Sequence, residues 1–121
     1  MCLLGAQLAD DAATAPTEEE RSTTFQLLDF LTPMIKSWPS EYGPKANSHA
    51  IQVLGGSGYV NEHPVEMMYR DNRLNPIHEG TTGIQSLDLL ARKVPRDNLA
   101  GYRACLAAIG ETVDEARGLE A

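Results

Sequence analysis

The chain has 121 residues, of which 42% are hydrophobic and 22% charged, as in an ordinary one-domain globular protein. Ten Lys and Arg against 17 Asp and Glu give a net charge of −7, which argues against non-specific nucleic-acid binding. No apolar run approaches the roughly 20 residues of a membrane span. The two cysteines, Cys2 and Cys105, are too few for a disulfide scaffold and have no metal-ligand spacing, so we expect no metal site and a reduced, cytoplasmic location.

The first eight residues are apolar and typical of a helix, but no N-cap residue precedes them. They are not a secretory signal, because they carry no cationic region and meet Asp10 and Asp11 too soon. Two interpretations stay open. One is a short helix at a true N-terminus, and the other is a chain that begins inside a helix, as a truncated protein would.

A second helical stretch follows Pro16, where Thr17 and Glu20 have the spacing of a capping box. Its apolar residues recur every three or four positions and predict one buried stripe: Phe25, Leu28, Leu31, Ile35 and Trp38. Pro33 predicts a kink. The breakers Pro39, Gly43 and Pro44 predict an interruption, then a separate helix over 46–54 that the glycines at 55, 56 and 58 end.

The rest of the chain predicts three more helices and no strand. Pro64 suits the first turn of a short helix that Pro76 ends, and a second helix follows residues 79–82 with Ile84, Leu87, Ala91 and Val94 on one face. Asp97 is placed to cap a last helix, whose inward face would hold Tyr102, Leu106, Ile109 and Val113. Residues 111–121 are expected to be frayed. An all-α fold follows.

Two segments carry candidate functional residues. Glycines such as Gly55 and Gly56 let a ligand approach the backbone, but they follow a helix end, whose dipole disfavours anions; the pattern alone favours a helix stop and a turn. Glu79 stands where a loop becomes a helix, and a carboxylate there serves as a general base if a pocket desolvates it. The pattern alone favours a helix cap for Glu79 over a catalytic base.

Together, these segments resemble the C-terminal helical domain of acyl-CoA dehydrogenases. The resemblance rests on Gln-Val-Leu-Gly-Gly-Ser-Gly-Tyr at 52–59, Pro-Val-Glu at 64–66, Tyr-Arg-Asp at 69–71 and Ile-His-Glu-Gly-Thr at 77–81. It implies an up-down helical bundle, incomplete here, over residues 1–95 and truncated at its start. Residues 96–121 would be an extra C-terminal helix with a frayed tail. Family members keep one long helix where the local pattern predicts a break.

The resemblance also implies a chemistry. These enzymes hold FAD and oxidise an acyl-CoA to the trans-2-enoyl-CoA, as in fatty acid β-oxidation. Glu79 would be the base that removes the α-proton, with its pKa raised by burial between flavin and acyl chain. His78 and Gly80 would bind substrate. Cofactor-binding residues would be Gln52, Val53, Gly55 and Gly56, towards the FAD of a neighbouring subunit, and Thr81 and Gly83 near the ribityl and phosphate groups.

The implied partners are an acyl-CoA substrate, further copies of the chain in a homo-oligomer, and an electron-transfer acceptor. Because the domains that hold the flavin ring are missing, we expect the chain alone neither to retain FAD nor to turn over acyl-CoA. Two alternatives stay open. One is an acyl-CoA oxidase or another flavoenzyme of the same superfamily, and the other is a non-catalytic helical assembly module.

Overall fold

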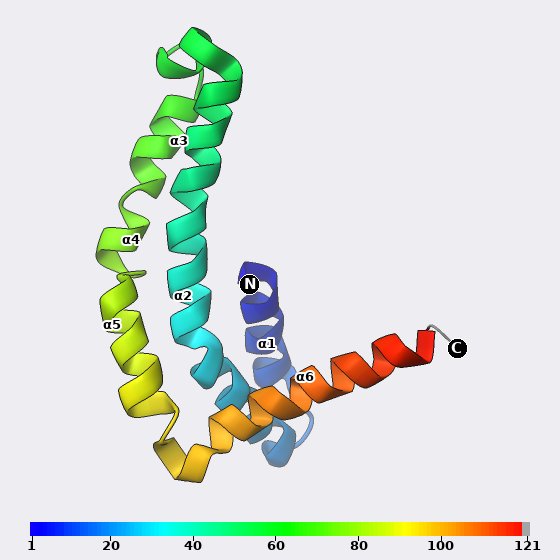
Figure 1. The fold of residues 1–121 in the computed structure, drawn as a ribbon. Helices are drawn as coiled ribbons and strands as arrows, with labels where there is room; N and C mark the ends of the chain where they lie inside the picture. Colours follow the sequence, from blue (N-terminus) through cyan, green and yellow to red (C-terminus); the bar gives the residue numbers. More distant parts are fainter. Residues whose placement is uncertain (120–121) are drawn as a thin grey trace. The chain divides into compact units, whose positions relative to one another are not determined.

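A computed structural model describes residues 1–119, which contain helices and no strand, so the all-α prediction is confirmed for this range (Figure 1). The helices are α1 (Cys2–Thr14), α2 (Glu18–Leu54), α3 (Val65–Asn72), α4 (Asn75–His78), α5 (Thr82–Leu87) and α6 (Ala100–Leu119). Short irregular helices cover Gly55–Tyr59, Asp88–Lys93 and Arg96–Leu99. None of the described helices is long and apolar enough to cross a membrane.

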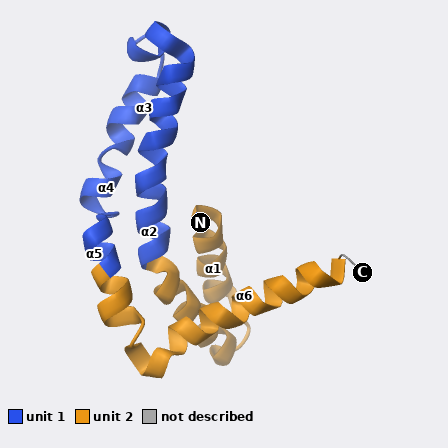
Figure 2. Ribbon diagram, in the orientation of Figure 1, with its two compact units in different colours: residues 1, 33–86 blue, residues 2–32, 87–121 orange. Residues whose placement is uncertain are grey.

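The chain forms two compact units, and the long helix α2 contributes to both (Figure 2). One unit contains residues 33–86 together with Met1, and it includes the second half of α2 with α3, α4 and most of α5. The other contains residues 2–32 and the described residues from 87 onward. The candidate catalytic segment around Glu79 therefore lies wholly in the first of these units.

The start of α2 is the one the capping box predicts. The backbone N–H of Glu20 donates to Oγ1 of Thr17 at 3.2 Å, which satisfies one of the free donors at the helix start. Glu18, Glu19 and Glu20 occupy the first turn, where their charges complement the positive end of the helix dipole.

The predicted break at residues 39–44 is wrong, because α2 runs without interruption through Pro33, Pro39 and Pro44. Packing in the first unit explains why Gly43 does not stop the helix. A Cβ at residue 43 would lie 2.6 Å from Nδ2 of Asn72, so the glycine makes room for that side chain. Asn72 in turn donates to Oδ1 of Asn47 at 2.8 Å. Tertiary contacts thus override the local helix-breaking signal.

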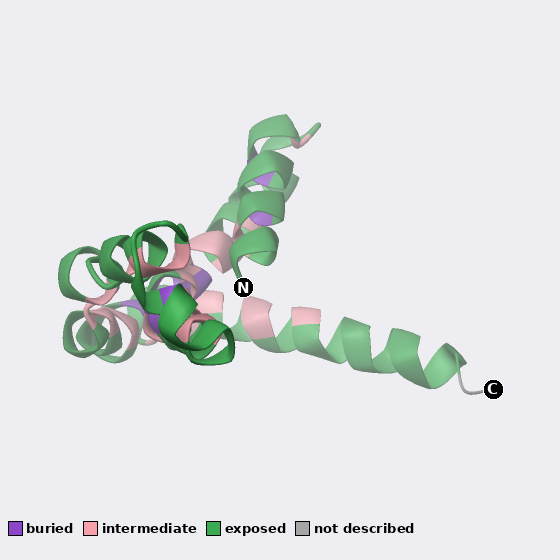
Figure 3. Cartoon of the chain, turned by 90° about the horizontal axis from the view of Figure 1, so that it is seen from above, coloured by how far each residue is buried: buried purple, intermediate pink, exposed green. Residues whose placement is uncertain are grey.

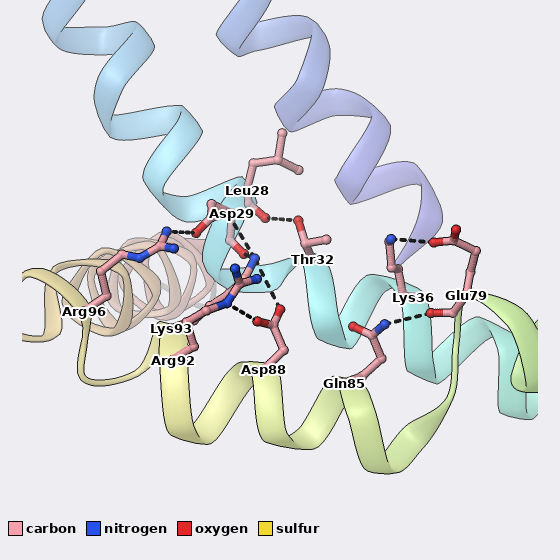
Figure 4. Close-up of polar contacts among 10 residues, drawn as sticks. All are labelled: Leu28, Asp29, Thr32, Lys36, Glu79, Gln85, Asp88, Arg92, Lys93 and Arg96. Atoms are coloured by element: carbon pink, nitrogen blue, oxygen red, sulfur yellow. Dashed lines mark hydrogen bonds and ion pairs between the residues drawn. The ribbon is translucent and has the colours of Figure 1, made fainter.

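Pro33 is accommodated by Lys93, the last residue of the irregular helix Asp88–Lys93. A proline has no N–H, so the carbonyl of Asp29 four residues earlier loses its helix partner. Nζ of Lys93 donates to that carbonyl, and it also lies 3.0 Å from Oδ1 of Asp29 (Figure 4). The Lys93 side chain is only 4% exposed, so the bond is made away from solvent.

Glycines end α2 as the sequence predicts. The helix stops at Leu54, and Gly55 follows with a φ of 59°, a left-handed conformation that favours glycine. Gly58 is buried, and a Cβ there would lie 2.9 Å from the carbonyl oxygen of Ile51. The turn after α2 therefore depends on glycine at two positions.

Two local predictions in the second half of the chain are wrong, and a third helix differs from the prediction in its geometry. Pro76 does not end the preceding helix, since α3 stops at Asn72 and Pro76 lies in the first turn of α4, where a missing N–H costs nothing. Asp97 is not the cap of α6: it has a left-handed φ of 49°, and α6 begins three residues later. The helix that starts at Thr82 continues as predicted, but it widens into a π-helix at Asp88.

The predicted core is only partly buried (Figure 3). Among the described residues, the buried apolar side chains are Leu8, Ala12, Phe30, Leu31, Pro33 and Pro44. Both ends of the predicted stripe on α2 are exposed, Phe25 by 59% and Trp38 by 54%. The predicted inward face of α6 is also exposed, at Tyr102, Leu106, Ile109 and Val113. These faces lack a second layer of helices within the described chain.

The frayed tail expected over residues 111–121 stays a prediction, and residues 111–119 are exposed to solvent. Residues 111–119 belong to α6, whose alanine, glutamate and leucine residues have high helix propensity. Residues 120 and 121 lie outside the described part of the chain.

Candidate active site

The candidate site is the loop between α4 and α5, which contains Glu79. Glu79 and Gly80 close α4 through their backbone, and both N–H groups donate to the carbonyl of Asn75. The carbonyl of Glu79 accepts from Nε2 of Gln85 at 2.7 Å. Both the N–H and the carbonyl of Glu79 are thus hydrogen-bonded. The side chain of Glu79 does not cap α5, contrary to the interpretation that the local pattern favours.

Gly80 fixes this loop against α2. Gly80 is buried, and its carbonyl accepts from Oγ of Ser40 at 3.2 Å. A Cβ at residue 80 would lie 1.9 Å from that same oxygen, so only glycine allows the approach. One residue past Ser40, the carboxylate of Glu41 accepts from Oγ1 of Thr82 at 2.8 Å. The loop therefore has a defined position on one face of α2.

The carboxylate of Glu79 forms an ion pair with Lys36, with 2.6 Å between Oε2 and Nζ (Figure 4). The hydrogen bond and the charge of Lys36 lower the pKa of Glu79, and the charge of His78 adds to this lowering. This is opposite to the direction expected for a base buried between flavin and acyl chain. The reason is exposure: the Glu79 side chain is 63% exposed here, so desolvation has little effect on its pKa.

A shallow depression of about 380 Å³ lies beside the carboxylate. Its lining comes from α2, α3, α4 and the loop, and consists of Lys36, Pro39, Ser40, Gly43, Asn72, Asn75, Glu79 and Gly80. Gly43 and Gly80 contribute no side chain to the depression, and Lys36 and Glu79 place one charge of each sign at its edge.

The other residues predicted near the flavin and substrate lie close to Glu79 in the chain. His78 is the exposed last residue of α4, and Oγ1 of Thr81 donates to the carbonyl of Ile77 at 2.9 Å. Gly83 is exposed in the first turn of α5, and a Cβ there would meet nothing within 4 Å. The loop and the start of α5 thus gather His78, Glu79, Gly80, Thr81 and Gly83 in one region of the first unit.

The remaining predicted cofactor residues lie at the other end of α2. Gln52 and Val53 are exposed in the last turn, and Gly55 and Gly56 follow in the turn after it. Gln52 is twelve residues from Ser40, the residue that contacts Gly80, which corresponds to about 18 Å along the helix. The structure therefore does not bring the two predicted sets together within one chain.

Sequence reasoning missed Lys36 and Ser40, the two side chains of α2 that contact the loop. Lys36 is 43 residues away from Glu79, and no local pattern marks such a contact. The only signal is their spacing, since residues 36 and 40 are one helical turn apart and share a face. Among residues 1–119, no cluster of three or more His, Cys, Asp or Glu side chains could hold a metal ion.

Comparison with known proteins identifies the class to which this helical site belongs. Residues 5–94 match the family model described as acyl-CoA dehydrogenase, C-terminal domain. The match includes both halves of α2, the glycine turn and the Glu79 loop. The chain therefore belongs to the acyl-CoA dehydrogenase family.

Individual relatives carry the same family name. The chain is 42% identical over 105 residues to 3-methylmercaptopropionyl-CoA dehydrogenase of Ruegeria pomeroyi, a match that covers 87% of this chain and 18% of the relative. It is 34% identical over 90 residues to a broad-specificity linear acyl-CoA dehydrogenase of Mycobacterium tuberculosis, covering 74% of this chain and 15% of the relative. It is 50% identical over 54 residues to the mitochondrial short-chain specific acyl-CoA dehydrogenase of Rattus norvegicus, covering 45% and 13%. The chain thus spans less than a fifth of the length of these relatives.

Proposed function

We propose that this chain acts as the C-terminal part of a longer flavin-dependent acyl-CoA dehydrogenase, in which Glu79 removes the α-proton of the acyl-CoA. The observation that carries the proposal is the loop itself. Its backbone is anchored on α2 through Gly80 and Ser40, while the Glu79 carboxylate projects from it with 63% of the side chain exposed. A base must have a fixed position and an accessible oxygen, and this loop supplies both.

The residues present fit the cofactor that the family implies. A Cβ at Gly55, Gly56 or Gly83 would meet nothing within 4 Å, so the backbone at each is open to a ligand. We propose that Thr81 and Gly83 contact the FAD beside Glu79, and that Gln52, Val53, Gly55 and Gly56 contact the FAD of a neighbouring subunit. The two sets of residues lie about 18 Å apart along α2.

FAD supplies the hydride acceptor when it is bound. The work of this chain is to place the base and the groups around the thioester. Glu79 takes the α-proton on a carboxylate oxygen, and its backbone N–H would bind the thioester oxygen once it is released from the carbonyl of Asn75. We propose that His78 and Gly80 lie beside the substrate because they are the chain neighbours of Glu79.

The test is a Glu79→Gln variant of the longer enzyme, compared with Glu66→Gln, which changes an acidic side chain on α3. Removing a general base costs about 10² to 10⁴-fold in rate, so we expect enoyl-CoA formation to fall by at least 10²-fold in Glu79→Gln. Glu66→Gln should retain most of the wild-type rate. Wild-type turnover by Glu79→Gln would contradict the proposal and favour a non-catalytic helical module.

We further propose that the 121-residue chain alone neither retains FAD nor oxidises acyl-CoA, because the candidate site is open to solvent on one side. A purified chain should be colourless and should not reduce an electron acceptor with acyl-CoA. A yellow, active preparation would contradict this. We also propose that the longer protein is a cytoplasmic homo-oligomer and that it passes electrons to an electron-transfer acceptor.

A further inference from the structure

We propose that Lys36 is a positioning residue for the base: its ammonium holds Oε2 of Glu79 and leaves Oε1 free to take the proton. This inference rests on the proposed function and deepens it. The contact joins α2 to the loop across 43 residues of sequence, with 2.6 Å between Nζ and Oε2.

The ion pair between Lys36 and Glu79 is one of several contacts between α2 and the region of the Glu79 loop, and is not an isolated surface pair. Lys36 and Ser40, one turn apart on α2, contact Glu79 and Gly80, and the next residue, Glu41, contacts Thr82. The Ser40 contact holds the backbone of Gly80, and the Glu41 contact holds the hydroxyl of Thr82. Lys36 makes the one contact of the three that reaches the candidate base. The packing of the loop and the start of α5 against α2 therefore sets the position of Lys36 relative to Glu79.

The ion pair engages only one of the two carboxylate oxygens. Within residues 1–119 the bond from Lys36 goes to Oε2, and no donor is placed on Oε1. A carboxylate needs one unoccupied lone pair to accept a proton. In the proposed step the α C–H bond breaks, an O–H bond forms at Oε1, and the C–H electron pair stays with the thioester enolate.

The charges that face Glu79 come from two elements. Lys36 projects from α2, and His78 from α4 is the adjoining residue; both lower the pKa of Glu79. From α5, Gln85 contributes a neutral amide to the Glu79 carbonyl, and Glu41 of α2 is engaged by the hydroxyl of Thr82. Lys36 is the first cause of the lowered pKa, so its removal should make the carboxylate lose its charge at a higher pH.

The test is the pH dependence of kcat/KM for the longer enzyme with its FAD bound, measured for the wild type, Lys36→Met, Lys36→Arg and Lys45→Met. Lys45 is a matched control, an exposed lysine nine residues further along α2 that lies over the ring of Tyr42. We expect the acid limb of the profile to move to higher pH in Lys36→Met, to return towards the wild-type position in Lys36→Arg, and to stay in place in Lys45→Met.

An acid limb that does not move in Lys36→Met would overturn the inference, and so would an equal movement in Lys45→Met. A loss of folded enzyme alone would lower the amount of activity without moving the limb, and Lys36→Gln repeats the test if Lys36→Met does not fold. The result for Glu79→Gln separates the two claims. If that variant is inactive while the limb of Lys36→Met stays in place, only the role of Lys36 fails.

Discussion

At the scale of single residues, Lys93 shows how a buried charge supplies the donor that a proline inside a continuous helix lacks. Its ammonium contacts the carbonyl and the carboxylate of Asp29, and Arg96 binds the other oxygen of that carboxylate at 2.9 Å. No buried side-chain nitrogen or oxygen is left without a partner in the described chain. Lys93 thus replaces the amide hydrogen that Pro33 lacks.

Replacing Lys93 by Met should therefore destabilise the chain. The Asp29 carbonyl would lose its donor inside the structure, which costs about 1–3 kcal/mol. Urea unfolding followed by circular dichroism measures the loss. The exposed partner of Asp88, Arg92, is the control, because Arg92→Met removes only a surface ion pair and should have little effect.

In a Pro33→Ala background, we expect Lys93→Met to lower the free energy of unfolding by less, because residue 33 then has an N–H for the Asp29 carbonyl. A double-mutant cycle measures the difference directly. Equal costs in both backgrounds would show that Lys93 does not serve that carbonyl.

The two cysteines should differ in reactivity. Burial raises the pKa of the Cys105 thiol, which reduces its thiolate fraction at neutral pH, whereas Cys2 is exposed. We expect iodoacetamide to label Cys2 first at pH 8, as followed by peptide mass spectrometry. Faster labelling of Cys105 would contradict the burial of its side chain.

At the scale of elements, the contact between α2 and the Glu79 loop depends on the lack of a side chain at residue 80. A Cβ there would meet Oγ and Cβ of Ser40 at 1.9 and 2.3 Å, so Gly80→Ala must push the loop away from α2. Overpacking of this kind costs about 1–3 kcal/mol, and urea unfolding measures it.

Gly83→Ala is the matched control for this change, since its Cβ would enter open space at the start of α5. We expect Gly83→Ala to leave the unfolding free energy unchanged or slightly higher, because alanine favours a helix more than glycine does. A loss as large as that of Gly80→Ala would mean that the tight contact with Ser40 is not the cause.

Some ends of the helices could be predicted from the sequence, whereas features that depend on packing between helices could not. Local signals located the start of α2 at Thr17, its end before Gly55 and the start of α5 near Thr82, because caps and glycines act within one turn. Pro39 and Gly43 led to the wrong prediction of a helix break, since whether the helix continues through them depends on packing against Asn72 and Gly80. The Lys36–Glu79 contact escaped prediction for the same reason.

At the scale of the whole molecule, the described chain leaves many large apolar side chains uncovered, such as those on the exposed face of α6. Faces of this kind favour association with other protein surfaces. We expect the 121-residue chain to self-associate, with a sedimentation coefficient that rises with concentration. A constant monomer across that range would contradict the interpretation of these faces as interfaces.

The removal of the α-proton by Glu79 can be measured separately from the redox chemistry. A 3-thia-acyl-CoA has α-hydrogens but no β-hydrogen, so the longer enzyme in D₂O can exchange its α-proton without oxidising it. We predict that the wild type incorporates deuterium at the α-carbon and that Glu79→Gln does so at least about 10²-fold more slowly. Equal incorporation by the two proteins would contradict the claim.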